Sequence, residues 1–256
     1  ITAATVSLGF GGYFAQFIDL PITISAILLI GILSVVNFIG IKESSWANTI
    51  FAIITIGGLA LIIFLGMSFE TTEPVDYFEN PNGITGIILA FILIFFAFIG
   101  FEDLANIAEE VKRPQKTLPR AIILAVVISG VIYILVSLSV VRVINWEELG
   151  QSTAPLAAVA ERSLGIQGNI ILSAIALFAT ASTVLITLVA GSRMLYGMAN
   201  HKSIPLFLGK IHSKTKTPWI AVIVISITSI VFAFSGDIVI VANITVFAVV
   251  ITFAMI

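Results

Sequence analysis

The sequence predicts an all-α protein that crosses a membrane several times, and three observations support this fold class. Hydrophobic residues make up 59% of the 256 residues, charged residues make up only 10%, and the mean hydropathy is +1.17. A soluble domain of this length needs far less apolar surface to form one core. Apolar windows of about 20 residues, the length that crosses ~30 Å of hydrocarbon, recur along the chain. Clusters of helix-breaking residues, such as Asn80-Pro81-Asn82-Gly83, separate these windows.

Eight apolar windows are predicted to be membrane-spanning helices. In chain order they cover residues 1–18, 21–41, 46–67, 83–108, 118–141, 168–199, 217–236 and 238–256. The first window lacks an initiating Met and a basic flank, and the last stops within an apolar run. We therefore expect one transmembrane domain over residues 1–256 that is truncated at both ends.

Turn and capping residues set the window boundaries. Breaker clusters lie at residues 19–21, 73–74, 80–83 and 214–218, each between two apolar runs. Thr117 and Pro119 suit the start of the fifth helix, because Thr caps a helix and Pro is tolerated in its first turn. Residues 145–164 are too polar to span a membrane, but their apolar spacing predicts a short amphipathic helix that acts as an outer lid.

Basic residues alternate between the two sides of the predicted membrane. Cytoplasmic loops near helix ends are enriched in Lys and Arg, whereas acidic residues have little weight in orientation. One set of loops is therefore predicted to be cytoplasmic: Lys42, Lys112, Arg113, Lys116, Arg120, Arg193, Lys202, Lys210, Lys214 and Lys216. The opposite loops hold only Arg142 and Arg162 among basic residues, beside most of the acidic ones, and should face outward.

Several function classes are excluded by what the sequence lacks. The chain has no Cys, which excludes a disulfide framework and a thiolate metal site. Both histidines, His201 and His212, occur in one basic loop, and no HExxH, GxSxG or GxxxxGK[ST] motif is present. We predict neither an enzyme nor a metal centre nor a nucleic-acid partner, and no cofactor beyond a coupling proton or sodium ion.

The best candidate for a transport site is the stretch FFAFIGFEDLANIAEEVKRPQKTLPR, residues 95–120. An apolar helix is interrupted there by glycine and carboxylates, and irregular backbone persists in hydrocarbon only where it lines protein or a water-filled cavity. The predicted substrate-binding residues are Phe96, Ala97, Phe98, Ile99 and Gly100, whose freed amides and carbonyls would meet the charged ends of a substrate. The alternative is that Gly100 only allows close helix packing.

Two carboxylates, Glu102 and Asp103, are the predicted coupling or gating groups. On a regular helix adjacent residues point about 100 degrees apart, so both cannot face one ligand. Burial would raise a carboxyl pKa and make Glu102 a proton carrier, whereas an ion pair would have the reverse effect. The sequence leaves the two alternatives open.

The same stretch resembles the sixth helix and following loop of amino acid permeases of the amino acid-polyamine-organocation superfamily. Asn37-Phe-Ile-Gly40-Ile-Lys42 is similar to the segment that closes the family's fourth helix, and Ser192-Arg193-Met-Leu-Tyr196 to the one that closes its eighth. Thr217-Pro218-Trp219 is similar to the entry to the ninth. The resemblance implies the family's inverted repeat of five plus five helices, from the end of the third helix to the tenth. The broken first helix, which supplies half of the substrate site in the family, would lie outside this chain.

Two positions bear on coupling under this resemblance. Thr55 occupies the position at which proton-driven members of the family can carry a lysine. The lysine that takes part in proton coupling in those members is therefore absent here. In sodium-coupled relatives, hydroxyls of the eighth helix help to hold the ion, and Thr180, Ser182 and Thr183 lie at matching positions. Hydroxyls are also common in helix packing, which is the alternative role for these three residues. The usual Arg-Asp-Gly after the eighth helix is replaced by Asn200-His201-Lys202.

The predicted function is secondary active transport of amino acids or related amines across the plasma membrane by alternating access. The predicted partners are a small-molecule substrate and the lipid bilayer. A sensor of the same fold, which binds an amino acid without moving it, is the main alternative, and a channel is disfavoured because polar residues gather at helix breaks. The amino acid, the coupling ion and the oligomeric state stay open.

Overall fold

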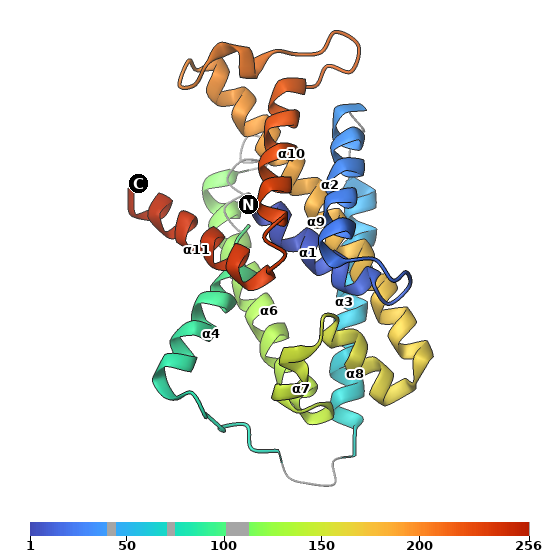
Figure 1. Ribbon diagram of the computed structural model, residues 1–256. Coiled ribbons are helices and arrows are strands. Elements are labelled where there is room, and N and C mark those ends of the chain that lie inside the picture. Colours follow the sequence, from blue (N-terminus) through green and yellow to red (C-terminus); the bar gives the residue numbers. More distant parts are fainter. Residues whose placement is uncertain (40–44, 71–74, 101–112, 256) are drawn as a thin grey trace.

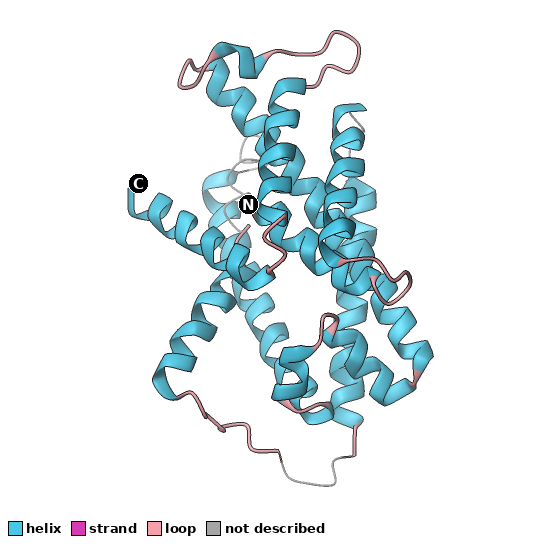
Figure 2. Cartoon of the chain, in the orientation of Figure 1, coloured by secondary structure: helices cyan, strands magenta, loops and turns pink. Residues whose placement is uncertain are grey.

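The computed structural model describes residues 1–39, 45–70, 75–100 and 113–255, and these contain helices, turns and loops but no strand (Figure 2). Every predicted window contains a helix (Figure 1). The helices are α1 (Thr2–Phe14), α2 (Ile22–Ile39), α3 (Ser45–Ser68), α4 (Gly83–Phe98), α6 (Pro114–Val143), α9 (Ile166–Asn200), α10 (Trp219–Ala233) and α11 (Ile238–Met255). Two short helices, α7 (Trp146–Gln151) and α8 (Pro155–Leu164), and a 3-10 turn, η2 (Leu206–Gly209), lie in the loops.

Five helical segments in the described residues are long and apolar enough to cross a membrane. They are Ile22–Ile39, Ile50–Ser68, Pro114–Val143, Ile166–Asn200 and Ile238–Met255. The remaining apolar helices α1, α4 and α10 are shorter, with 13, 16 and 15 residues. The chain is therefore a multi-pass α-helical membrane protein, as its composition predicted.

The long helix α9 lies at the centre of the bundle and packs against α1, α2, α3, α8 and α10 (Figure 1). Glycines lie at two of these contacts: Gly168 of α9 lies against the backbone of Ala160 on α8, and Gly58 of α3 lies against Ile175 of α9, as is common in membrane bundles. One buried cluster joins α1, α2, α9, α10 and α11; its members are Ala3, Ala4, Leu8, Ala26, Leu29, Ile30, Val184, Leu188, Ala233 and Val241.

A second buried cluster joins α3, α6, α8 and the start of α9. Its members are Ile62, Val140, Val143, Ile144, Ala154, Ala157, Val159, Ala160 and Leu172. Three residues of α8 belong to it, so the buried face of this short helix is apolar, in agreement with the amphipathic helix expected over residues 155–160. Whether this segment acts as a lid stays a prediction.

The fourth helix differs from the predicted range of 83–108. α4 ends at Phe98, and residue Ile99 is already extended, with φ −60° and ψ 134°. Gly100 follows at φ +117°, a conformation that residues with a Cβ rarely adopt. The interruption predicted near Gly100 is therefore present, with the helix ending two residues before the glycine, and residues 101–108 lie outside the described part of the chain.

The two ends of the bundle differ in charge as the loop pattern predicted. The loop between α9 and α10, which carries four lysines, lies at the same end of the bundle as the last turn of α2 and the start of α6 (Figure 1). The short helices α7 and α8, which hold Glu147, Glu148 and Glu161, lie at the opposite end (Figure 1).

Lys202 terminates α9 in the left-handed region, with φ +60°. Its N–H donates to the carbonyl of Ala199 and the N–H of Ser203 to that of Met198, both at 3.0 Å, which is the pattern of a helix end that favours glycine. Lys202→Gly is therefore expected to raise the free energy of unfolding by up to ~1 kcal/mol. Thermal unfolding in detergent checks this prediction. Lys202→Val is the opposite change and should lower Tm. A Gly variant with a lower Tm than the native protein would contradict the strain argument.

Candidate functional site

The candidate site begins where the last turn of α4 opens. The N–H of Ile99 donates to the carbonyl of Phe96 at 3.2 Å, which tightens the turn before the chain becomes extended. A Cβ placed on Gly100 would have no atom within 4 Å, so there is open space beside this residue. Phe96, Phe98 and Ile99 are partly buried, whereas Ala97 and Gly100 are exposed. The five predicted substrate-binding residues, which are consecutive, thus span the last turn of α4 and the two residues after it, and their role stays a prediction.

Tyr133 of α6 supports this segment from the neighbouring helix. Its hydroxyl donates to the carbonyl of Ala97 at 2.9 Å. Its ring meets the ring of Phe98 edge to face, with centroids 5.2 Å apart and an interplanar angle of 71°. The carbonyls of the last helical turn have no partner inside the helix, and an unpaired carbonyl is costly in hydrocarbon. Tyr133 thus donates to a carbonyl that the end of α4 leaves without a partner inside the helix.

Sequence reasoning missed Tyr133. The only signal is a single phenol inside the apolar run of residues 131–136, since a buried or half-buried Tyr hydroxyl usually finds a partner. Its partner lies 36 residues away in the sequence and could not be identified from spacing.

The predicted coupling carboxylates, Glu102 and Asp103, lie outside the described residues, and their role stays a prediction. Thr55 lies on α3, partly buried, and its hydroxyl donates to the carbonyl of Phe51 at 2.9 Å. The ring of Phe51 stacks on that of Phe178 with centroids 6.1 Å apart, so this part of α3 packs against α9. The structure does not bring Thr55 to the end of α4 through any contact recorded for the described residues.

The three hydroxyl residues of the predicted ion site lie on α9. The hydroxyl of Thr180 donates to the carbonyls of Ala176 and Leu177 at 2.7 and 3.2 Å. The hydroxyl of Thr183 donates to that of Ala179 at 3.0 Å, and Ser182 is partly buried. Donation to the preceding turn satisfies the hydroxyl protons and leaves oxygen lone pairs available to accept. This geometry is compatible with ion binding and with packing, and the ion site stays a prediction.

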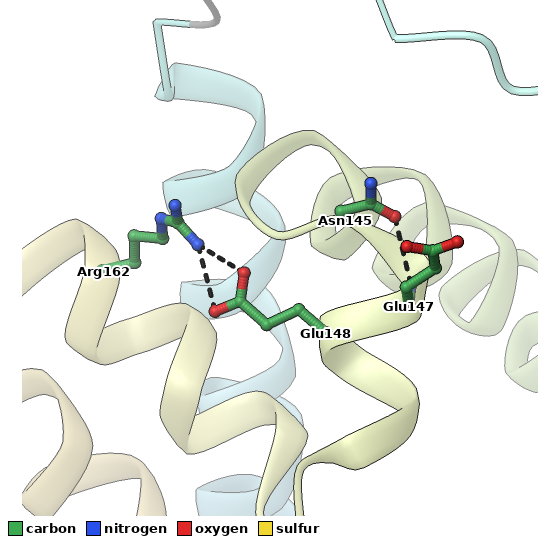
Figure 3. A network of polar contacts seen from close by, with 4 residues as sticks. All are labelled: Asn145, Glu147, Glu148 and Arg162. Atoms are coloured by element: carbon green, nitrogen blue, oxygen red, sulfur yellow. Dashed lines mark hydrogen bonds and ion pairs between the residues drawn. The ribbon is translucent and has the colours of Figure 1, made fainter.

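Among the described residues, no group of three or more His, Asp or Glu side chains is arranged to hold a metal ion. The end of the bundle that holds α7 and α8 instead contains a small polar network (Figure 3). Both carboxylate oxygens of Glu148 on α7 accept from Nη1 of Arg162 on α8, at 3.2 and 2.9 Å. The side chain of Asn145 accepts from the N–H of Glu147 at 3.1 Å and caps α7.

Loss of the Arg162–Glu148 ion pair is expected to have little effect on stability. The two side chains are 49% and 62% exposed, and exposed ion pairs contribute about 0–1 kcal/mol. Glu148→Gln should therefore change Tm by no more than ~3 °C, and the change should vanish at high salt. Thermal unfolding at low and high salt checks this prediction. A larger decrease in Tm that high salt does not reduce would mean that the ion pair is screened from solvent.

A close contact joins α1 to the segment between α7 and α8. A Cβ on Gly12 would collide with the backbone carbonyl of Thr153. The amide of Asn169 on α9 also donates to Gln16 at 3.2 Å and to Glu161 at 2.6 Å. The segment of α7 and α8 is therefore attached to α1 and α9.

Comparison with known proteins agrees with the fold and the motifs. The amino acid permease family matches residues 1–256. The branched-chain amino acid permease BcaP of Bacillus subtilis is 28% identical over 246 residues, which cover 86% of this chain and 52% of that protein. The vacuolar cationic amino acid transporter 4 of Arabidopsis thaliana is 30% identical over 220 residues, covering 83% and 36%. The methylthioribose transporter of Bacillus subtilis is 29% identical over 201 residues, covering 78% and 42%.

The chain thus spans about half, or less, of the length of these relatives. The match to the family nevertheless covers the whole chain, including the end of α4 at Phe98. It places the protein among permeases and not among enzymes, as the absence of catalytic motifs led us to expect. The chain belongs to the amino acid permease family.

Proposed function

We propose that this chain forms most of the scaffold and one half of the substrate site of a secondary transporter for amino acids or related amines. The observation that carries the proposal is the open segment at residues 96–100, where helix α4 ends in an extended residue and a left-handed glycine. In transporters with broken helices, backbone groups at the break bind the charged ends of a substrate. The ammonium and carboxylate of an amino acid have the donors and acceptors that this backbone can match.

Alternating access would arise if the bundle that contains α4 moves relative to the rest. α4 packs on α11, which belongs to the buried cluster with α1, α2, α9 and α10, and α4 makes its recorded polar contact with α6. Among the described residues, α11 is the main link between α4 and that cluster, so α4 could rock together with α11 around the site. The carboxylates Glu102 and Asp103 would couple this movement to a proton, and Thr180, Ser182 and Thr183 to sodium.

The substrate class follows from the family and from what its members are named for. BcaP and the Arabidopsis protein are named for branched-chain and cationic amino acids, and one relative is named for methylthioribose. Most of the side chains around residues 96–99 are apolar, which favours an amino acid with an apolar side chain over a charged one. Similarity to a bacterial permease such as BcaP also supports a location of the protein in the plasma membrane.

Uptake by the full-length protein that contains this chain, purified and reconstituted in proteoliposomes, tests this function. The panel contains radiolabelled branched-chain, aromatic, cationic and small amino acids, with methylthioribose as a substrate that is not an amino acid. Each is assayed without a gradient, with a proton gradient, with a sodium gradient and in counterflow. Accumulation of an apolar amino acid above the level of empty liposomes is the expected result, and the gradient that it needs names the coupling ion.

Three other outcomes have a definite meaning. Counterflow without dependence on either gradient would identify an exchanger. Saturable binding of an amino acid to folded protein without flux would replace transport by sensing. Uptake of methylthioribose alone would overturn the amino acid assignment while preserving the transporter.

A further inference from the structure

The loop between α9 and α10, residues 201–218, is the most basic segment in the described residues. Lys202, Lys210, Lys214 and Lys216 are all exposed, and no Asp or Glu occurs between Glu161 and Asp237. An electropositive surface therefore extends over one end of the bundle, beside the end of α2 and the start of α10 (Figure 1).

The same loop exposes large apolar side chains. Leu206 and Phe207, on η2, are 64% and 60% exposed, and Ile211 is 46% exposed. Lys202 lies two positions after the end of α9 and Lys216 three positions before the start of α10, so the loop stays close to the level where the helices end. Apolar groups between lysines at this depth match the border of lipid headgroups and acyl chains.

The second half of the loop is held in one shape by hydrogen bonds. The N–H of His212 donates to the carbonyl of Thr217 at 2.9 Å, and the N–H of Lys216 donates to the carbonyl of His212 at 3.0 Å. The hydroxyl of Thr217 donates to the carbonyl of Phe38 on α2 at 2.9 Å, and the ring of His212 lies 5.1 Å from that of Phe38. Lys214 and Lys216 thus project from an ordered turn that is fixed to α2, which lowers the entropic cost of binding.

We propose that residues 201–218 form a binding surface for the headgroups of anionic phospholipids in the inner leaflet. The lysines would contact the lipid phosphates, and Leu206, Phe207 and Ile211 would enter the layer just below the headgroups. Juxtamembrane lysines attract anionic lipid through the negative surface potential of the leaflet. A lipid surface fits this loop better than an acidic protein does. Both would match the positive charge of a loop without carboxylates, but an acidic protein would leave the exposed apolar residues without a hydrophobic environment.

Native mass spectrometry of the purified protein, titrated with phosphatidylglycerol or with phosphatidylcholine of the same acyl chains, tests this proposal. The native protein is expected to bind the first phosphatidylglycerol molecules more tightly than phosphatidylcholine. The variant K202Q/K210Q/K214Q/K216Q should weaken phosphatidylglycerol binding at least about tenfold, because each lysine at a membrane surface contributes a several-fold preference. The matched control K202R/K210R/K214R/K216R keeps the charge and should retain binding within about twofold.

Further measurements guard against a trivial loss of binding. Thermal unfolding shows that each variant is folded, and if the fourfold variant is not, the single variants Lys210→Gln and Lys214→Gln should each weaken binding about two- to fivefold. The change Phe207→Ser should weaken both lipids, because it removes an apolar contact but no charge. The proposal would be overturned if the glutamine variants kept the native preference for phosphatidylglycerol, or if the arginine variant lost as much binding as the glutamine variant. Displacement of the lipid by millimolar glycerol 3-phosphate would also overturn it, because that result would indicate a site for soluble phosphate.

Discussion

Gly66→Ala is expected to lower the free energy of unfolding by about 3 kcal/mol. A Cβ at residue 66 would collide with the carbonyl oxygen of Ser139 and lie 2.5 Å from its Cβ and 2.7 Å from its carbonyl carbon. These are backbone and near-backbone atoms of α6 that cannot rotate away, so α3 and α6 would have to separate. Overpacking of this kind typically costs 1–3 kcal/mol.

The neighbouring contacts show why separation would be costly. The hydroxyl of Ser139 donates to the carbonyl of Ile63 at 3.4 Å, and the guanidinium of Arg142 donates to that of Phe69 at 3.3 Å. Both bonds cross the same pair of helices within two turns of Gly66, and Ile62 is fully buried there. Moving α3 outward would stretch the two bonds and open a cavity beside Ile62.

Gly57→Ala on the same helix is the matched control. A Cβ at residue 57 would have no atom within 4 Å, so Ala should be neutral or should stabilise α3 by up to ~1 kcal/mol through its higher helix propensity. Thermal unfolding in one detergent compares both variants, with a loss of about 5–10 °C in Tm expected for Gly66→Ala only. Equal Tm values for the two variants would mean that the crossing adapts to the added methyl group.

Much of the fold could be predicted from the sequence because hydrocarbon imposes strict rules. Long apolar runs and breaker clusters located the helices: each predicted window contains a helix, and α2, α3 and α11 begin and end within two residues of their predicted ranges. The break near Gly100 was also predicted, from the glycine and the carboxylates that follow the apolar run. The exact residue at which α4 ends was not, because Phe98 and Ile99 are as apolar as a continuing helix would be, and the end depends on backbone angles and on a partner in another helix.

The glycines illustrate the same limit. Gly57, Gly58 and Gly66 all lie on α3, and the sequence alone does not say which of them faces a partner. In the structure Gly66 meets α6, Gly58 lies against the side chain of Ile175 on α9, and Gly57 faces open space. The choice depends on how α3 is rotated in the bundle, and this rotation is set by packing with helices that lie far away in the sequence.

Tyr133→Phe is expected to have the largest effect on function among the changes that preserve the fold. The variant keeps the ring that packs against Phe98 and removes only the donor to the carbonyl of Ala97. Without that donor the carbonyl must find water or shift the last turn of α4, and the loss of one such hydrogen bond costs about 0.5–1.5 kcal/mol. Because residues 96–100 would then sample several conformations, the proposed substrate site would be formed for a smaller fraction of the time.

The expected result is about tenfold weaker binding of the transported amino acid, measured as Kd by calorimetry and as KM for uptake, with Tm lowered by only a few degrees. A change in Kd that exceeds the change in stability identifies Tyr133 as a residue that positions the site, because a purely structural role would lower Tm and leave the Kd of the folded protein unchanged. Tyr196→Phe on α9 is the control, since its hydroxyl has no hydrogen bond recorded within the described residues. If both Tyr variants bind substrate as the native protein does, the open end of α4 does not depend on α6 and the substrate must be held by other contacts.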